Sequence, residues 1–140
     1  MSGTLIYIDS SALIAAVQEE HQHHRALLEW LQSEATVGQL LSSKLLDLEV
    51  NRRYVNSKHS TQPLGPDFLA AANALIDRLV LVGITDQVLA MAKQMNASVK
   101  SLDAIHVATA LTHTCKTLVT YDVRMFKVAD RFGMIAASPE

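Results

Sequence analysis

Short apolar runs that pass directly into helical patterns dominate this sequence. The run 4–9 (TLIYID) is apolar and β-branched, and a helical pattern begins immediately after it. The run 117–122 (TLVTYD) is of the same kind and is also followed by a helical segment. Strands that alternate with helices build βαβ units, in which the strands are parallel and helices cover both faces of the sheet. The pattern therefore predicts an α/β fold with three layers, α/β/α, around a central, mostly parallel sheet of about five strands.

Apolar periodicity and the positions of Gly, Pro and capping residues predict the remaining elements. We expect strands at 4–9, 37–41, 80–84, 117–122 and 134–136, and helices at about 11–20, 23–34, 43–57, 67–78, 86–96, 101–111 and 123–132. The segment 57–66 holds two prolines and a glycine, which predicts an exposed loop. Asp67 and Ser101 are expected to cap the helices that begin beside them.

Size and composition limit the classes of protein to which the chain can belong. Its 140 residues are 49% hydrophobic and 19% charged, which suffices for one buried core, so we expect a single domain over residues 1–140. The apolar stretches are too short to span a bilayer and the N-terminus lacks signal-peptide features, so a cytoplasmic protein without a membrane partner is expected. The one cysteine, Cys115, excludes an internal disulfide and a cysteine-based zinc site, and we expect it in the core.

Four acidic residues lie where this fold would bring them together. Asp9 and Asp122 end the two strands described above, and ligand sites in open parallel sheets form at the carboxyl ends of the strands. Asp103 falls in the first turn of a helix, where the helix dipole favours a carboxylate. Glu49 lies among apolar residues of another helix, where a carboxylate is costly without a compensating charge. Because Mg2+ and Mn2+ prefer oxygen ligands, these four acids predict a metal site.

Each of the four acids also has a simpler structural interpretation. Asp9 and Asp122 could cap the helices that follow their strands. Asp103 could do no more than complement the helix dipole, and Glu49 could form an ordinary exposed i,i+4 pair with Arg53. Taken singly, these interpretations are the better ones, and only the joint pattern favours a site.

Basic residues surround the acids although the net charge is -2, which by itself gives no support for nucleic-acid binding. They are Arg52, Arg53, Lys58 and His59 after the acid at position 49, and Lys116, Arg124, Lys127 and Arg131 around the acid at position 122. A solvated helix face explains any one of these charges. Their position beside the acids is the reason to consider them as phosphate-binding residues.

The histidines and the single tryptophan receive structural interpretations. His21, His23 and His24 lie close together, but no cysteine or further ligand completes a tetrahedral metal site, so we interpret them as solvated residues at a helix junction. His106 is expected to be a packed or hydrogen-bonded residue beside the core and is left out of the catalytic set. Trp30 is expected to pack at a helix contact rather than to stack on a base.

Four segments occur in an order and at a spacing that characterise one family. They are YIDSSAL near the N-terminus, the E of LLDLEVNRR, LDAIHVATA, and LVTYDVRMF near the C-terminus. Together they resemble the PIN-domain ribonucleases and, among these, the VapC-like toxins of prokaryotic toxin–antitoxin pairs. The resemblance implies a PIN-like domain with an acidic cluster and supporting hydroxyl side chains. By position, the cluster falls on Asp9, Glu49, Asp103 and Asp122, and the hydroxyls on Ser10 or Ser11 and Thr120.

This resemblance implies a metal-dependent endoribonuclease that cleaves RNA phosphodiester bonds with metal-activated water. The four acids would bind one or two Mg2+ ions, directly or through water, with Mn2+ as a substitute. The resemblance also implies a homodimer that acts as a toxin, and an antitoxin protein that blocks the acidic groove.

Two other classes of protein remain as alternatives. A phosphohydrolase with Asp9 as its nucleophile would carry a second Asp two residues later, where Ser11 stands instead. A non-catalytic module that binds protein or RNA would show no metal-dependent turnover.

Overall fold

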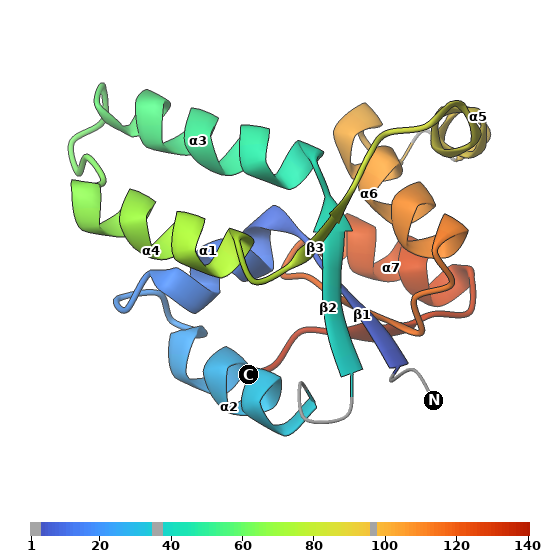
Figure 1. Ribbon diagram of the computed structural model, residues 1–140, viewed down its shortest axis with the longest axis horizontal. Coiled ribbons are helices and arrows are strands. Elements are labelled where there is room, and N and C mark those ends of the chain that lie inside the picture. Colours follow the sequence, from blue (N-terminus) through green and yellow to red (C-terminus); the bar gives the residue numbers. More distant parts are fainter. Residues whose placement is uncertain (1–3, 35–37, 96–97) are drawn as a thin grey trace.

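The structure, a computed structural model, describes residues 4–34, 38–95 and 98–140 (Figure 1). The strands are β1 (Thr4–Ile8), β2 (Gly38–Ser43), β3 (Val80–Val82), β4 (Thr117–Val119) and β5 (Ile135–Ala137). The helices are α1 (Ser10–Val17), α2 (His24–Glu34), α3 (Leu45–Ser57), α4 (Pro66–Ile76), α5 (Asp86–Lys93), α6 (Ser101–Thr112) and α7 (Val123–Arg131). Every predicted element is present with shifted ends, and positions 37 and 96 of the prediction lie outside the described residues. None of the described helices is long and apolar enough to cross a membrane.

The described strands form one sheet in the order β3-β2-β1-β4-β5, and all neighbouring pairs are parallel. The chain builds outward from β1 to β3 and then places β4 and β5 on the other side of β1. The strand order therefore reverses between β1 and β4, which is where ligand sites form in open parallel sheets. Ile8 pairs with Val119 at this point, so the residues that follow the two strands, Asp9 and Thr120, lie side by side.

Helices cover both faces of the sheet, which confirms the predicted three-layer arrangement. Helices α1, α2, α3 and α4 lie on one face, and α5, α6 and α7 lie on the other (Figure 1). The side chains of β1 alternate between the two: Ile6 and Ile8 belong to the core under α1, whereas Tyr7 belongs to the core under α6. This alternation follows from the period of two along a strand.

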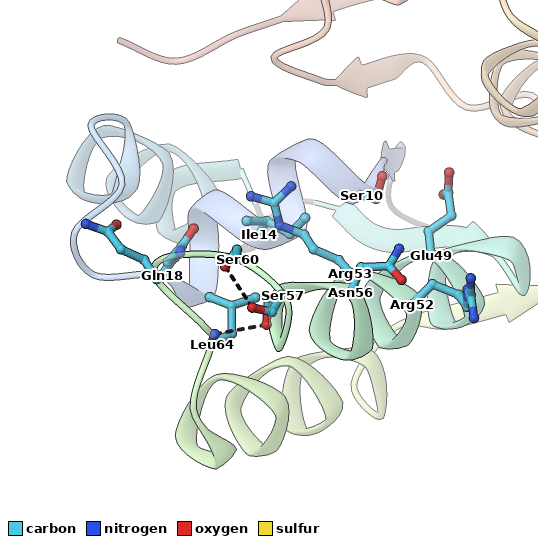
Figure 2. A pocket seen from close by; sticks show the side chains of 11 residues that line it. Ser10, Ile14, Gln18, Glu49, Arg52, Arg53, Asn56, Ser57, Ser60 and Leu64 are labelled. Atoms are coloured by element: carbon cyan, nitrogen blue, oxygen red, sulfur yellow. Dashed lines mark hydrogen bonds between the residues drawn. The ribbon is translucent and has the colours of Figure 1, made fainter.

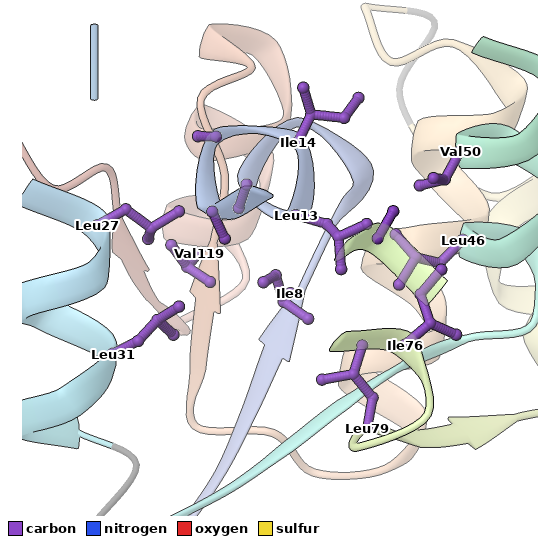
Figure 3. Close-up of a cluster of buried hydrophobic side chains, with 14 of the residues drawn as sticks. Ile8, Leu13, Ile14, Leu27, Leu31, Leu46, Val50, Ile76, Leu79 and Val119 are labelled. Carbon is purple, nitrogen blue, oxygen red and sulfur yellow. The ribbon is translucent and has the colours of Figure 1, made fainter. Parts of the chain in front are cut away.

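The core under α1 fixes the position of two elements that carry acids. Leu13 of α1 is fully buried in one cluster with Ile8 of β1 and Leu46 of α3 (Figure 3). This packing holds the start of α1, which follows Asp9, against α3, which carries Glu49. Two smaller predictions are also confirmed, because Trp30 packs against this cluster and Cys115 is buried in the core on the other face.

Two helix starts differ from the prediction. Helix α4 begins at Pro66 with Gly65 as its N-cap, because proline is well suited to the first helical position, and Asp67 therefore lies inside the first turn. The N-cap of α6 is Lys100, which makes no side-chain capping bond, and Ser101 is the first residue of the helix.

Helices α6 and α7 end with the same hydrogen-bond pattern. In α7, Gly133 has a φ of +87°, and the N–H of Met134 donates to the carbonyl of Ala129 at 3.1 Å. In α6, Thr114 has a φ of +55°, and the N–H of Cys115 donates to a carbonyl five residues back at 2.9 Å. Both are Schellman motifs, and α6 places a threonine where glycine is the usual residue.

Candidate functional site

Asp9 lies directly after β1 and is the N-cap of α1. Its Oδ1 accepts a hydrogen bond from the N–H of Ala12 at 2.9 Å, and its Oδ2 accepts one from Thr120 Oγ1 at 2.5 Å. Ser11 Oγ lies 2.8 and 3.0 Å from the two carboxylate oxygens and donates to them. The side chain is 2% exposed, and this burial raises the pKa of the carboxyl although the hydrogen bonds act in the opposite direction.

Two hydroxyl groups connect the ends of β1 and β4. Ser11 Oγ lies 3.3 Å from Thr120 Oγ1 and accepts a hydrogen bond from the N–H of Tyr121 at 2.9 Å. Thr120 Oγ1 accepts a hydrogen bond from the N–H of Asp122 at 3.0 Å. Of the two serines considered as supporting hydroxyls, the structure therefore places Ser11 in this network, and Ser10 lines a groove beside it.

Asp122 is the N-cap of α7. Its Oδ1 accepts a hydrogen bond from the N–H of Met125 at 2.9 Å. The simple interpretation of Asp9 and Asp122 as helix caps is therefore correct. It does not exclude a further role, because a carboxylate has more acceptor sites than one capping bond uses.

Asp103 lies in the first turn of α6, and the charges of the other acids affect the pKa of its carboxyl. Burial raises the pKa of its carboxyl, and the charge of Asp122 raises it further, followed by smaller effects of Asp9 and Glu49. His106 acts in the opposite direction. Because such interactions weaken with distance, the four acids share one electrostatic environment, although they come from four separate places in the chain. We call these four residues the acidic cluster.

Glu49 of α3 is paired with a histidine rather than with an arginine. Its Oε1 lies 2.5 Å from His106 Nε2, and the pair with Arg53, which was the simpler alternative, is not formed. The second nitrogen of the imidazole, Nδ1, lies 2.5 Å from the hydroxyl of Tyr7. His106 is 0% exposed, so the prediction of a buried, hydrogen-bonded histidine is confirmed. Sequence reasoning missed Tyr7, because nothing in an apolar strand distinguishes a tyrosine with a partner from one that only packs.

The oxygen ligands of the acidic cluster are of the type that divalent cations prefer. The side chains, however, do not converge on a common position for an ion. Within the described ranges, no group of three His, Cys, Asp or Glu side chains could hold a metal ion as placed. Asp9 and Asp122 each turn an oxygen to a helix N-terminus, and Glu49 turns one to a histidine. No Lys or Arg forms an ion pair with these acids in the same ranges. Carboxylates without such a partner repel one another, and a hard cation would relieve this repulsion. Metal ligation by the cluster stays a prediction.

A groove of about 720 Å3 begins at the acidic cluster and runs between α1 and α3. Figure 2 shows Ser10 and Glu49 at one end of the groove and Gln18 at the other. Arg52 and Arg53 of α3 also line it, so two of the eight basic residues named from the sequence lie in the same groove as Glu49. An anionic polymer could contact both arginines while a phosphate reaches the cluster.

A second hollow of about 700 Å3 lies beside the start of α7. His23 stacks on Tyr121 with ring centroids 4.5 Å apart and an angle of 3° between the planes, and His21 lies next to both rings. The Nδ1 of His24 lies 2.9 Å from the carbonyl oxygen of Ala15. These histidines do occupy a helix junction, but they are half-buried rather than fully solvated. Burial lowers the pKa of His21, with a smaller effect from the charge of His23.

Comparison with known proteins identifies the family. Residues 6–131 match the family model of the PIN domain, so this chain belongs to the PIN domain family. One relative is "Ribonuclease VapC35" of Mycobacterium tuberculosis, which is 29% identical over 140 residues, a match that covers 96% of this chain and 97% of the relative.

Solved structures share the fold at low sequence identity. The crystal structure of VapBC2 from Rickettsia felis, bound to a DNA fragment from its promoter, matches with a TM-score of 0.72 and 14% identity, over 97% of this chain and 99% of that one. A toxin–antitoxin complex from Klebsiella pneumoniae matches with a TM-score of 0.65 and 19% identity, over 96% of this chain and 98% of that one. These likenesses confirm the predicted PIN-like α/β/α fold.

Proposed function

We propose that this protein is a ribonuclease that cleaves RNA phosphodiester bonds and depends on Mg2+ or Mn2+. The family membership and the name of the relative VapC35 support the reaction. The observation that carries the site is the meeting of Asp9 and Asp122 at the ends of the neighbouring strands β1 and β4, where the Thr120 hydroxyl bonds to the Asp9 carboxylate and to the N–H of Asp122. The whole chain, residues 1–140, would act as one nuclease domain.

In this proposal, Asp9, Glu49, Asp103 and Asp122 hold the cation directly or through water. When bound, one or two such ions would supply a water of lowered pKa for attack on phosphorus and charge stabilisation for the leaving oxygen. Thr120 and Ser11 hold the Asp9 carboxylate in place through their hydrogen bonds.

Arg52 and Arg53 would bind RNA phosphates along the groove beside the cluster. Both line the groove at the end of which Glu49 stands. A planar guanidinium matches the geometry of phosphate oxygens, so the two residues would orient the chain of phosphates toward the acids. Their contribution would be to binding and register rather than to base recognition.

An antitoxin protein and a second copy of this chain are the proposed partners, with this protein as the toxin of the pair. The structural likeness to a toxin–antitoxin complex supports the first partner, and the resemblance to VapC-like toxins supports both. The antitoxin would block the acidic cluster, where a basic side chain would meet carboxylates that pair with no Lys or Arg among the described residues. Light scattering of the purified chain, alone and with the co-expressed antitoxin, would measure both assemblies.

The experiment that tests the function is cleavage of total cellular RNA by antitoxin-free protein in Mg2+, Mn2+ or EDTA. We expect discrete fragments with either metal, none in EDTA, and none from an Asp103→Asn variant. Asp130→Asn is the matched control, because Asp130 is an exposed acid of α7 outside the cluster. Equal cleavage by native protein and Asp103→Asn would contradict the site, and absence of cleavage by folded protein under all conditions would contradict the ribonuclease proposal.

A further inference from the structure

A buried chain of hydrogen bonds links the core to Glu49. It starts at Tyr7 near the carboxyl end of β1, passes through His106 of α6 and ends at Glu49 of α3. Tyr7 and His106 are both 0% exposed, whereas the Glu49 side chain is 20% exposed and lines the groove. The hydrogen-bond chain therefore runs from a fully buried residue of β1 to the edge of the acidic cluster.

One arrangement of protons satisfies every hydrogen bond between these three residues. The N–H of Ser43 donates to the Tyr7 oxygen at 3.2 Å, and the phenol can donate its own proton to His106 Nδ1. The imidazole then carries its proton on Nε2 and donates it to Glu49 Oε1. Burial raises the pKa of Tyr7, which keeps the phenol protonated as a donor. No buried side-chain N or O atom among the described residues lacks a partner.

Glu49 is the member of the cluster that needs such support. Asp9 and Asp122 are fixed by capping bonds within one helical turn, whereas Glu49 lies in the interior of α3 on a longer side chain. Fixing a free glutamate side chain costs conformational entropy, so a preformed orientation favours ligand binding.

We propose that His106 is a positioning residue that orients the Glu49 carboxylate toward the acidic cluster, and that Tyr7 fixes the imidazole for this purpose. This inference rests on the proposed metal-dependent function. Hydrogen-bond partners of metal-binding carboxylates characteristically affect metal affinity without contacting the ion. His106 would act in the same manner, through Glu49 alone.

The test is a Mn2+ titration of the purified, RNA-free protein, in which electron paramagnetic resonance measures the free ion. We expect His106→Leu to weaken Mn2+ binding by about 10-fold to 100-fold. In a Glu49→Gln background the same change should have no further effect, because the two residues act as one unit. His106→Gln, whose amide can still donate to Glu49, should recover part of the loss. Tyr7→Phe should weaken binding less than His106→Leu.

Thr109→Val is the matched control, because Thr109 is a fully buried residue one turn further along α6 whose hydroxyl bonds within the helix. It should leave Mn2+ affinity unchanged. An equal loss from His106→Leu in the native and Glu49→Gln backgrounds would overturn the inference, and so would native affinity in His106→Leu when Glu49→Gln binds weakly. Failure of the metal proposal itself would appear differently, as equal Mn2+ binding by native protein and Glu49→Gln. If His106→Leu does not fold, His106→Gln and Tyr7→Phe carry the same comparison.

Discussion

Replacement of Thr120 by valine tests the hydrogen bonds that connect β4 to Asp9. Valine has nearly the same shape as threonine, so the change removes the hydroxyl with little loss of packing. The hydroxyl donates to the Asp9 carboxyl at 2.5 Å and accepts from the N–H of Asp122 at 3.0 Å. A hydrogen bond to a charged group contributes about 1.5 to 3 kcal/mol and a neutral one about 0.5 to 1.5 kcal/mol. Because Asp122 is half-exposed, water can replace part of the second bond, and we expect a total loss of about 2 to 4 kcal/mol.

Thermal and urea denaturation would measure this loss. An unfolding entropy of about 2.1 cal/mol/K per residue gives about 0.3 kcal/mol/K for this chain of 140 residues, so Tm should fall by about 7 to 14 °C. The penalty should shrink at acidic pH, because a protonated Asp9 gains less from a donor. Thr109→Val, an equally buried threonine with a hydrogen bond inside its own helix, should cost about 1 kcal/mol or less. Equal losses for both variants would refute the assignment of a special role to the Thr120 hydroxyl.

Three further predictions concern the acids, the groove and a helix end. Burial and Asp122 raise the pKa of Asp103 above its ordinary value of 3.8, so its contribution to stability is full below that pH and is lost as pH rises through the folded pKa. In EDTA, urea unfolding should therefore show Asp103→Asn to be more stable than the native chain at neutral pH, and an advantage that persists unchanged in acid would contradict this. Changing Arg52 and Arg53 to alanine should reduce the slope of log Kd against log salt for single-stranded RNA by about 1.4, because each lost phosphate contact lowers the slope by about 0.7. Filter binding at several salt concentrations measures this slope. Arg78→Ala is the control, because Arg78 lies outside the groove. Thr114→Gly should raise the free energy of unfolding by about 0.5 to 1 kcal/mol. A left-handed residue other than glycine costs about 1 to 2 kcal/mol, and the larger entropy of glycine in the unfolded chain offsets part of the gain. A loss of stability in urea would show that the hydrogen bond from the threonine hydroxyl to the His113 carbonyl outweighs the backbone strain.

The fold could be predicted from the sequence because local and global signals agree. The runs 4–9 and 117–122 have the composition of buried strands, and the helical patterns between them leave a parallel sheet as the arrangement that buries both sets of side chains. Helix starts were less predictable. Ser101 and Asp67 are good capping residues, but Lys100 and Gly65 hold the N-cap positions, and Pro66 suits the first turn of α4 better than a later position.

The placement of the four acids was predictable, whereas their contacts were not, and their role as a metal site stays a prediction. Strand ends and helix starts place Asp9, Asp103 and Asp122 near one another whatever their side chains do. The partner of Glu49 depends on tertiary packing instead. An i,i+4 arginine is visible in the sequence, whereas His106 reaches Glu49 only because α6 and α3 lie across the same end of the sheet.

The two interpretations of the acids, as helix caps and as a metal site, are compatible for a physical reason. In a folded cluster of carboxylates without a bound cation, each charge needs another source of compensation. Asp9 and Asp122 receive it from the backbone N–H groups at the starts of α1 and α7, and Asp103 from the positive end of the α6 dipole. Glu49 lies in the interior of α3, where no free N–H groups are present, and it is the acid that a buried histidine contacts. Local compensation of each charge therefore helps the fold to hold the four acids close together, and under the proposed function their remaining mutual repulsion would favour the binding of a cation.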